Sequence, residues 1–240
     1  MKILSIGNSF STDAHRFLHR LAQINAVEMK TVNLFIGGCD LETHWKNAEE
    51  NNTCYDLEIN GNEATEVVSI VQALNSEEWD IITLQQVSQL SGIFDSTKPY
   101  LMKLAQYVKQ AQPQAKLYYH QTWAYEIDSE HPGFLNYDKD QIIMHNRIKK
   151  TAHKAADDIG AQIIPTGDVI QQLRTTKEFD YKNGGLTLCR DGYHLSNDYG
   201  RFAAAATWLR TFTKKEIVCE NFDDFDNTII KVILDKVNSI

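Results

Sequence analysis

The chain has 240 residues, of which 42% are hydrophobic and 23% are charged, and its formal net charge is -8. This composition is typical of a globular protein with one sizeable core, and we expect a single domain over residues 1–240. Because the chain is acidic and lacks basic runs, nucleic acid and membrane surfaces are disfavoured as partners, which leaves small uncharged or cationic molecules.

Neither a targeting segment nor a membrane span is visible in the sequence. The first apolar run is too short for the hydrophobic region of a signal peptide, and no segment approaches the length that crosses a bilayer. The sequence contains four cysteines, Cys39, Cys54, Cys189 and Cys219. They lie far apart and form no C-x-x-C pair, so the sequence indicates neither a zinc site nor a redox dithiol. We therefore expect a cytoplasmic protein with reduced thiols.

Short β-type runs alternate with longer amphipathic stretches, and this pattern predicts βα units around a parallel sheet. A first strand at 2–6 precedes a helix over about 13–25, and a second strand follows at 29–36. The next connection is long and polar, and its segment 47–62 carries turn-forming residues suited to a small hairpin.

The second part of the chain continues the same alternation. Further strands are predicted at 79–84, 115–121 and 161–165. Further helices are predicted at about 63–75, 97–111, 138–158 and 197–212, while the tail at 222–240 closes with a strand or a helix. Five strands with helices between them predict a three-layer α/β/α sandwich around a five-stranded parallel sheet, a flavodoxin-like fold. Ligands of such folds bind beyond the carboxyl ends of the strands.

The first strand ends in I-G-N-S-F-S at 6–11, which raises the question of what Ser9 does. A serine at a turn from strand to helix can expose its hydroxyl, with backbone N–H groups aimed at a reacting carbonyl oxygen. The alternative is a helix cap, since residues 11–13 are all preferred capping types. A phosphate loop is disfavoured because Gly7 is the one glycine present and no lysine follows. Taken alone, such a serine is more often structural.

A second motif, D-G-Y-H, lies before the Ala-rich helix of the C-terminal part. A hydroxyl nucleophile needs a general base near neutral pH, and imidazole suits that task. The base in turn needs an acceptor that fixes its tautomer. Asp191 and His194, three residues apart, can form this pair within one loop. By itself, however, a loop histidine beside an aspartate is common.

Two further loops follow predicted strands. Gly37 and Gly38 come after the second strand, where a glycine pair permits close backbone approach and a free N–H donor. Gln85 and Gln86 come directly after the third strand and offer neutral amide donors. Each signal is weak, but the carboxyl ends of parallel strands share one edge of the sheet, so these groups are expected to converge with Ser9.

Aromatic residues also follow the predicted strands. Trp123 and Tyr125 come after the fourth strand, and Trp45 comes after the glycine pair. Such side chains can stack on a sugar ring or an aryl group, and packing in the core or in a lid is an equally good interpretation.

These blocks, in this order, resemble those of the SGNH (GDSL-type) hydrolases. The first block of that family, G-D-S-x-S, is similar to residues 7–11, which would make Ser9 the nucleophile and its N–H an oxyanion donor. The second block supplies a glycine, for which Gly38 is the best match and Gly37 the near alternative. The last block, D-x-x-H, matches D-G-Y-H at 191–194. The resemblance covers nearly the whole chain.

The sequence departs from the family pattern at two places. Asn8 stands where the family has aspartate, which changes the charge beside the serine. The third block, usually G-x-N-D, is replaced by L-Q-Q-V-S at 84–88, which looks similar to the Q-G-E-S block of the sialate O-acetylesterase branch. That similarity would give the amide of Gln85 the role of an oxyanion donor, with Gln86 and Ser88 as alternatives.

The resemblance implies acyl transfer through an acyl-enzyme, with no metal and no cofactor. The leading hypothesis is a serine esterase that removes O-acyl groups, mainly acetyl, from a small-molecule or saccharide ester. A thioesterase or lysophospholipase is the nearest alternative among enzymes. A flavodoxin-like module that binds a small ligand without turnover is the alternative from another class. Neither the natural ester nor the oligomeric state follows from the sequence.

Overall fold

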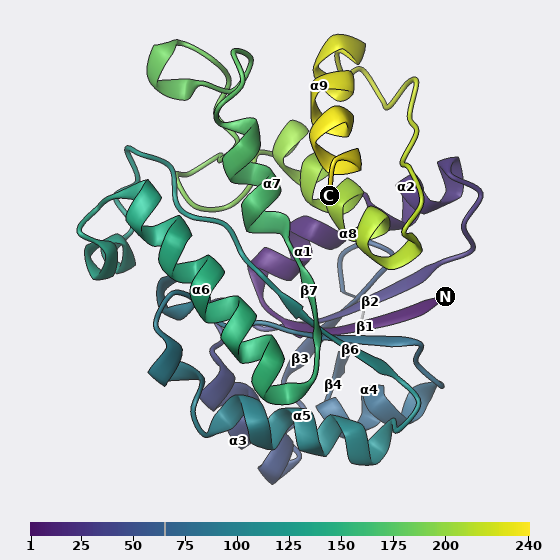
Figure 1. The fold of residues 1–240 in the computed structure, drawn as a ribbon. Coiled ribbons are helices and arrows are strands. Elements are labelled where there is room, and N and C mark those ends of the chain that lie inside the picture. The colour runs from purple at the N-terminus through teal and green to yellow at the C-terminus, as the bar shows by residue number, and fades with distance from the viewer. Residues whose placement is uncertain (65) are drawn as a thin grey trace.

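The computed structural model describes residues 1–64 and 66–240. Within these residues, seven strands form one sheet in the order β4-β3-β2-β1-β5-β6-β7 (Figure 1). The strands are β1 (Lys2–Gly7), β2 (Lys30–Phe35), β3 (Tyr55–Ile59), β4 (Val67–Val68), β5 (Ile81–Leu84), β6 (Lys116–His120) and β7 (Gln162–Ile164).

The predicted five-stranded parallel sheet is confirmed as the centre of the fold. β1 pairs in parallel with β2 and with β5, and the parallel pairing continues through β6 to β7. The sheet is larger than predicted, because β3 pairs antiparallel with β2 and β4 pairs antiparallel with β3. β3 lies inside the 47–62 segment, where the sequence predicts a hairpin, and β4 follows shortly after it.

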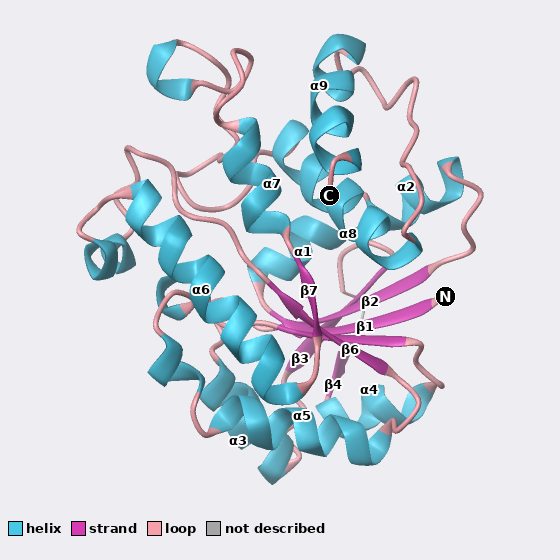
Figure 2. Cartoon of the chain, viewed as in Figure 1, coloured by secondary structure: helices cyan, strands magenta, loops and turns pink. Residues whose placement is uncertain are grey.

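Helices cover both faces of the sheet and give the three layers that the sequence predicts (Figure 2). Helices α1, α2, α7, α8 and α9 share one core cluster, α3, α4 and α5 share the other, and α6 contributes to both. Their bounds are α1 (Ser9–His15), α2 (Leu18–Ile24), α3 (Leu41–Glu50), α4 (Ile70–Ser76), α5 (Tyr100–Ala111), α6 (Gln141–Ile159), α7 (Thr166–Leu173), α8 (Tyr199–Thr213) and α9 (Asn227–Asn238).

The central strand β1 shows how the sequence builds the two cores. Side chains of a strand point alternately to opposite faces. Ile3 accordingly packs in the α1 and α8 layer, whereas Leu4 and Ile6 pack in the α3 and α5 layer. Ser5 interrupts the apolar run on the α1 side, where its hydroxyl lies 2.7 Å from Nε2 of the buried His15. A strand buried on both faces is what a near-continuous apolar run predicts.

Several helices differ from the prediction. The single helix expected at 13–25 is wrong: the segment forms α1 and α2, which are separated around Phe17. The polar connection after β2 contains α3, whose N-cap Asp40 accepts a hydrogen bond from the N–H of Thr43 at 2.8 Å. α7 was also not expected, and the tail forms the helix α9 rather than a strand. The polar composition of the α3 segment hid a helix that buries only a narrow face, as the burial of Leu41, His44 and Ala48 shows.

No helix in the described part of the chain is long and apolar enough to cross a membrane. The parallel strands instead fix a common geometry for the loops that leave them. The carboxyl ends of β1, β2, β5, β6 and β7 lie at the same edge of the sheet, which is where ligands of doubly wound folds bind. That edge holds the predicted site.

Candidate active site

The turn between β1 and α1 places Ser9 as the first residue of the helix. The N-cap is Asn8, whose Oδ1 accepts a hydrogen bond from the N–H of Phe10 at 3.0 Å. Ser11 completes a capping box, because its Oγ accepts from the N–H of Asn8 at 3.0 Å. The prediction that residues 11–13 begin the helix is therefore wrong, and Ser9 is not the cap. A Cβ on Gly7 would lie 2.1 Å from Oγ of Ser11, so this turn requires glycine.

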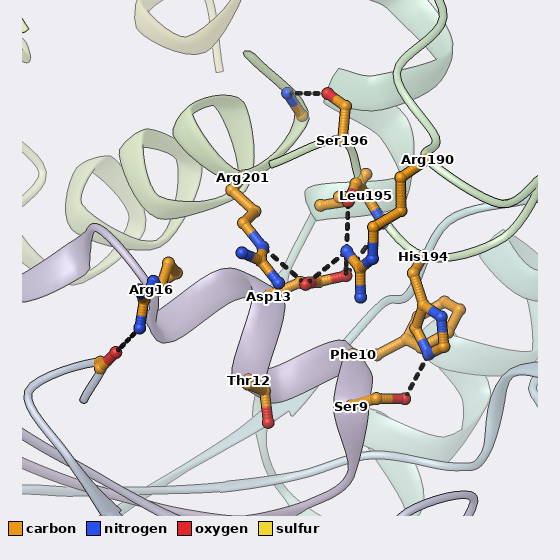
Figure 3. Close-up of polar contacts among 12 residues, drawn as sticks. Ser9, Phe10, Thr12, Asp13, Arg16, Arg190, His194, Leu195, Ser196 and Arg201 are labelled. Carbon is orange, nitrogen blue, oxygen red and sulfur yellow. Dashed lines mark hydrogen bonds and ion pairs between the residues drawn. The ribbon is translucent and has the colours of Figure 1, made fainter. Parts of the chain in front are cut away.

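Ser9, His194 and Asp191 form one chain of hydrogen bonds. Oγ of Ser9 lies 2.8 Å from Nε2 of His194, and Figure 3 shows the imidazole pointing at the serine hydroxyl. Nδ1 of His194 lies 2.7 Å from Oδ2 of Asp191. A carboxylate only accepts, so Nδ1 carries the hydrogen and Nε2 of the neutral ring accepts from the serine. This is the polarity that a general base needs.

The loop around Asp191 holds its carboxylate in a fixed orientation. Oδ1 accepts from the backbone N–H groups of Tyr193 at 3.1 Å and of His194 at 2.8 Å, while Oδ2 faces the imidazole. Burial alone would raise the pKa of Asp191, but the hydrogen bonds from the His194 ring and from the two N–H groups outweigh it and hold the pKa below its ordinary value. The carboxylate therefore stays ionised and orients the imidazole.

An ion cluster around a buried carboxylate joins the histidine loop to the serine helix (Figure 3). The side chain of Asp13 on α1 is 1% exposed and lies between Arg190 and Arg201. Its Oδ1 accepts from Arg190 Nη1 at 2.9 Å and from Arg201 Nε at 2.8 Å. Its Oδ2 accepts from the N–H of Leu195 at 2.9 Å. Arg190 also donates to the carbonyl of Leu195. The cluster sets the position of the loop that carries His194 relative to Ser9.

The glycine pair after β2 lies next to the serine turn. Gly38 has φ +64°, in the left-handed region that favours glycine, and both glycines are exposed. The side-chain Nδ2 of Asn8 donates to the carbonyl of Cys39 at 3.0 Å and thus ties the two loops together. The structure therefore brings the predicted second block beside the first.

The two glutamines after β5 are both buried and already hydrogen-bonded. Nε2 of Gln85 donates to Oδ1 of Asn8 at 2.8 Å, so Gln85 reaches the serine turn through its neighbour. Oε1 of Gln86 accepts from the N–H of Leu41 at 3.1 Å, and its Nε2 donates to the carbonyl of Ser96 at 3.0 Å. Gln86 thus ties the start of α3 to the loop after β5, and its proposed oxyanion role stays a prediction. The predicted oxyanion donation by Gln85 stays a prediction.

The aromatic residues named from the sequence do not line an open surface. Trp123 and Tyr125 are fully buried, and the Trp123 ring stacks on Phe10 with centroids 4.2 Å apart. Trp45 packs against Tyr107 of α5. Packing in the core is therefore the correct interpretation of Trp123 and Tyr125.

Two half-buried rings that the sequence analysis passed over lie beside the imidazole instead. The Tyr193 ring lies 4.2 Å from the His194 ring, and His131 meets Tyr193 edge to face at 4.7 Å. Burial and the charge that His194 gains on protonation lower the pKa of His131, while Asp191 acts in the opposite direction. Tyr193 stands inside the D-G-Y-H motif and was visible there. His131 belongs to no motif that the sequence analysis identified.

Other supporting residues were missed for identifiable reasons. Asp13 was treated as a capping residue, and Arg190 directly precedes the motif without belonging to it. Ser88, the last alternative for the third block, is buried with its hydroxyl 2.8 Å from that of Tyr125. His120 ends β6, and the same strand-end argument that located Gln85 would have found it.

Solved structures similar to this chain include the three that follow. A DUF4886 family protein from Bacteroides uniformis ATCC 8492 is 37% identical, with a TM-score of 0.92 over 100% of this chain and 93% of that one. A candidate SGNH hydrolase from Slackia heliotrinireducens is 23% identical, with a TM-score of 0.60 over 88% and 98%. Axe2, an acetylxylan esterase from Geobacillus stearothermophilus, is 14% identical, with a TM-score of 0.52 over 92% and 97%. No protein with a curated description matches.

The fold is that of the SGNH hydrolases, with the serine turn and the D-x-x-H loop at the carboxyl edge of the sheet. Within that fold, the chain belongs to the family described as "Domain of unknown function (DUF4886)", whose model matches residues 2–230. The resemblance to an atypical SGNH branch is thereby confirmed.

The Asp13 cluster yields a first prediction. Asp13→Asn keeps the shape of the side chain but removes the buried charge to which two partly exposed guanidinium groups and one backbone N–H donate, and breaking such a pair costs up to about 3 kcal/mol. We expect urea denaturation to show a loss of that order. Asp157→Asn, on the exposed face of α6, is the matched control and should leave stability unchanged. Equal stability of the two variants would contradict the structural role of Asp13.

Proposed function

We propose that the protein is a serine esterase that hydrolyses O-acyl esters of carbohydrates, mainly acetyl esters. The observation that carries this proposal is the unbroken hydrogen-bond chain from Oγ of Ser9 through His194 to Asp191. Ser9 and His194 lie 185 residues apart in the sequence, and the ion cluster around the buried Asp13 holds their two segments together. A helix cap or a surface histidine needs no such arrangement.

The proposed mechanism is acyl transfer. Nε2 of His194 takes the proton of Ser9 as Oγ attacks the ester carbonyl, and Asp191 stabilises the imidazolium that forms. The backbone N–H groups of Ser9 and Gly38 donate to the oxyanion. His194 then gives its proton to the leaving alcohol. In the second half of the reaction, His194 takes a proton from a water molecule that attacks the acyl-enzyme, and it returns this proton to Oγ of Ser9 as the acid leaves. Apart from water and the ester, side chains and backbone of this chain supply the nucleophile, the general base and the oxyanion donors of these steps.

A cavity beside Asp191 supports a polar leaving group. It has a volume of about 350 Å³, and its lining includes Asp191 but neither Ser9 nor His194. Most of the lining side chains are polar or charged: Glu126, Asp128, Glu130, Tyr181, Thr187, Arg190 and Asp191. Such groups suit the hydroxyl groups of a saccharide and offer little to a long acyl chain. The similar fold of Axe2, an acetylxylan esterase, supports the same substrate class.

A thioesterase or lysophospholipase is the second candidate, and a binding module without turnover is the third. The polar lining of the cavity beside Asp191 disfavours a thioesterase or lysophospholipase, which would need an apolar acyl channel. The hydrogen bond between Ser9 and His194 disfavours a binding module, because ligand binding alone does not need a base beside the serine hydroxyl.

Replacement of the nucleophile tests the reaction class. Ser9→Ala should lower the rate of p-nitrophenyl acetate hydrolysis by at least about 10³-fold, because the proposed mechanism uses the Ser9 hydroxyl as its nucleophile. A fluorophosphonate probe should label the wild type at Ser9 and leave Ser9→Ala unlabelled, as judged by intact mass. Ser76→Ala, at the exposed end of α4, should behave as wild type in both assays. Wild-type turnover by Ser9→Ala would refute the assignment, and an unlabelled, inactive wild type would favour a binding module.

The pH dependence of kcat/KM tests the roles of His194 and Asp191. His194 must be neutral to accept the proton, so activity falls as the pH falls. The pKa of Asp191 is held below its ordinary value, so this carboxylate stays ionised while His194 becomes protonated. We therefore expect an acid limb with a limiting slope of about one, from the protonation of a single group. A slope of two on the acid side would contradict these roles.

A substrate panel tests the acyl group and the alcohol. Acetylated xylo-oligosaccharides and p-nitrophenyl acetate should be hydrolysed with a kcat/KM at least about tenfold higher than p-nitrophenyl octanoate or lysophosphatidylcholine. The reason is the acidic, hydroxyl-lined cavity beside Asp191. A preference for the octanoyl ester or for the lysophospholipid would support the second candidate instead.

A further inference from the structure

A continuous chain of buried side chains runs behind the serine turn, across the ends of three strands. Trp208 of α8 donates from Nε1 to Oγ1 of Thr166 at 3.1 Å, and this hydroxyl lies 3.0 Å from Nε2 of His120. Nδ1 of His120 lies 2.7 Å from Oε1 of Gln85. Nε2 of Gln85 donates to Oδ1 of Asn8 at 2.8 Å. The strands concerned are β6, β5 and β1, in their order in the sheet.

Chemistry fixes the direction of every bond in this chain. The amide oxygen of Gln85 can only accept, so Nδ1 of His120 must donate. Burial lowers the pKa of His120 to about 3, and the ring is therefore neutral with a bare Nε2. That nitrogen accepts from the hydroxyl of Thr166, whose oxygen accepts from the indole N–H of Trp208. All donors thus point from the helix layer toward Gln85.

The chain ends at the two loops of the proposed oxyanion hole. The amide oxygen of Asn8 accepts from the N–H of Phe10, directly after Ser9. Its amide nitrogen donates to the carbonyl of Cys39, directly after Gly38. Gln85 adds a third contact to this amide, and it can do so in one orientation, because a flipped Gln85 would present its oxygen to the oxygen of Asn8. The contact with His120 in turn sets the orientation of Gln85.

The completeness of the chain argues against a purely structural use of these residues. Each nitrogen and oxygen in the side chains of Asn8, Gln85, His120, Thr166 and Trp208 has a partner. The equally buried His15 touches the same Trp208, yet it leaves Nδ1 without a partner. A fully satisfied buried network specifies one geometry, whereas apolar packing would fill the same volume with less desolvation.

We propose that His120 and Gln85 are positioning residues that hold Asn8, and through it the N–H groups of Ser9 and Gly38, at the spacing that acyl transfer requires. This inference rests on the proposed esterase function. Gln85, which is 2% exposed, then acts through Asn8 rather than by its own contact with the oxyanion.

Two substitutions at one position separate positioning from folding. His120→Asn can place an amide N–H where Nδ1 stands and so keep the donor to Gln85. His120→Gln places its amide farther out, toward Thr166, and loses that donor. Both variants bury one amide in place of a neutral imidazole, so we expect similar losses of thermal stability. We expect kcat of His120→Asn to stay within a few fold of wild type and kcat of His120→Gln to fall by about 10²-fold with KM little changed.

His15→Gln is the matched control. It also replaces a buried neutral histidine that contacts Trp208, but His15 bonds to Ser5 and not to Gln85. We expect it to lose stability while keeping the wild-type kcat. Equal kcat values for His120→Asn and His120→Gln, or a loss of kcat in His15→Gln as large as that in His120→Gln, would overturn the positioning role.

Backbone amide resonances in ¹H–¹⁵N spectra give a readout that does not depend on turnover. The N–H signals of Ser9 and Gly38 should move in His120→Gln and stay near their wild-type positions in His120→Asn. Unmoved signals in both variants would overturn the positioning role even in an active esterase. Failure of the proposed function is seen elsewhere, in a wild type that hydrolyses no ester or in an active Ser9→Ala.

Discussion

The buried carboxylate of Asp13 is the contact on which the candidate site depends. Ser9 lies at the start of α1 and His194 in a loop near the other end of the chain, and neither position fixes the other locally. Asp13 is one turn along α1 and accepts from Arg190, from Arg201 and from the backbone of the histidine loop. A charge removed from water must keep all of these partners, which makes their arrangement unique. The 2.8 Å contact between Ser9 and His194 follows from it.

On the other side of Ser9, Asn8 connects the serine turn to the loops that follow β2 and β5. The family pattern has aspartate at this position, and the structure explains why an amide serves here. Oδ1 of Asn8 accepts from Phe10 and Gln85, while Nδ2 donates to the carbonyl of Cys39. A carboxylate has no hydrogen to donate and would face that carbonyl with like charge. The atypical first block and the atypical third block are thus one feature, since Gln85 is the residue that donates to Asn8.

The fold and the site contribute different parts of the functional argument. Proteins of the SGNH fold share the sheet and the position of the loops, and that likeness is a statement about architecture. The proposed chemistry comes from the site itself: a hydroxyl, a neutral imidazole and a carboxylate in line, with two loops held beside them. The proposed preference for a polar ester is argued from the polar lining of the cavity beside Asp191. The class of reaction is therefore argued from the site, and the substrate class from the cavity, within an architecture that the fold supplies.

The sequence by itself determined the parallel sheet, the strand ends and the identity of the residues that meet there. Apolar runs and glycines are local signals, and parallel strands bring their carboxyl ends together whatever the details. Only the tertiary structure decided which partner each polar group takes. The sequence offered Asp13 as a capping residue and left Trp123 open between stacking on a ligand and packing in the core, because contacts between distant segments are not encoded in any local pattern. β4 and α3 were missed, and the antiparallel pairing of the predicted hairpin segment with β2 was not foreseen, for the same reason: packing against distant segments stabilises them more than local propensity does.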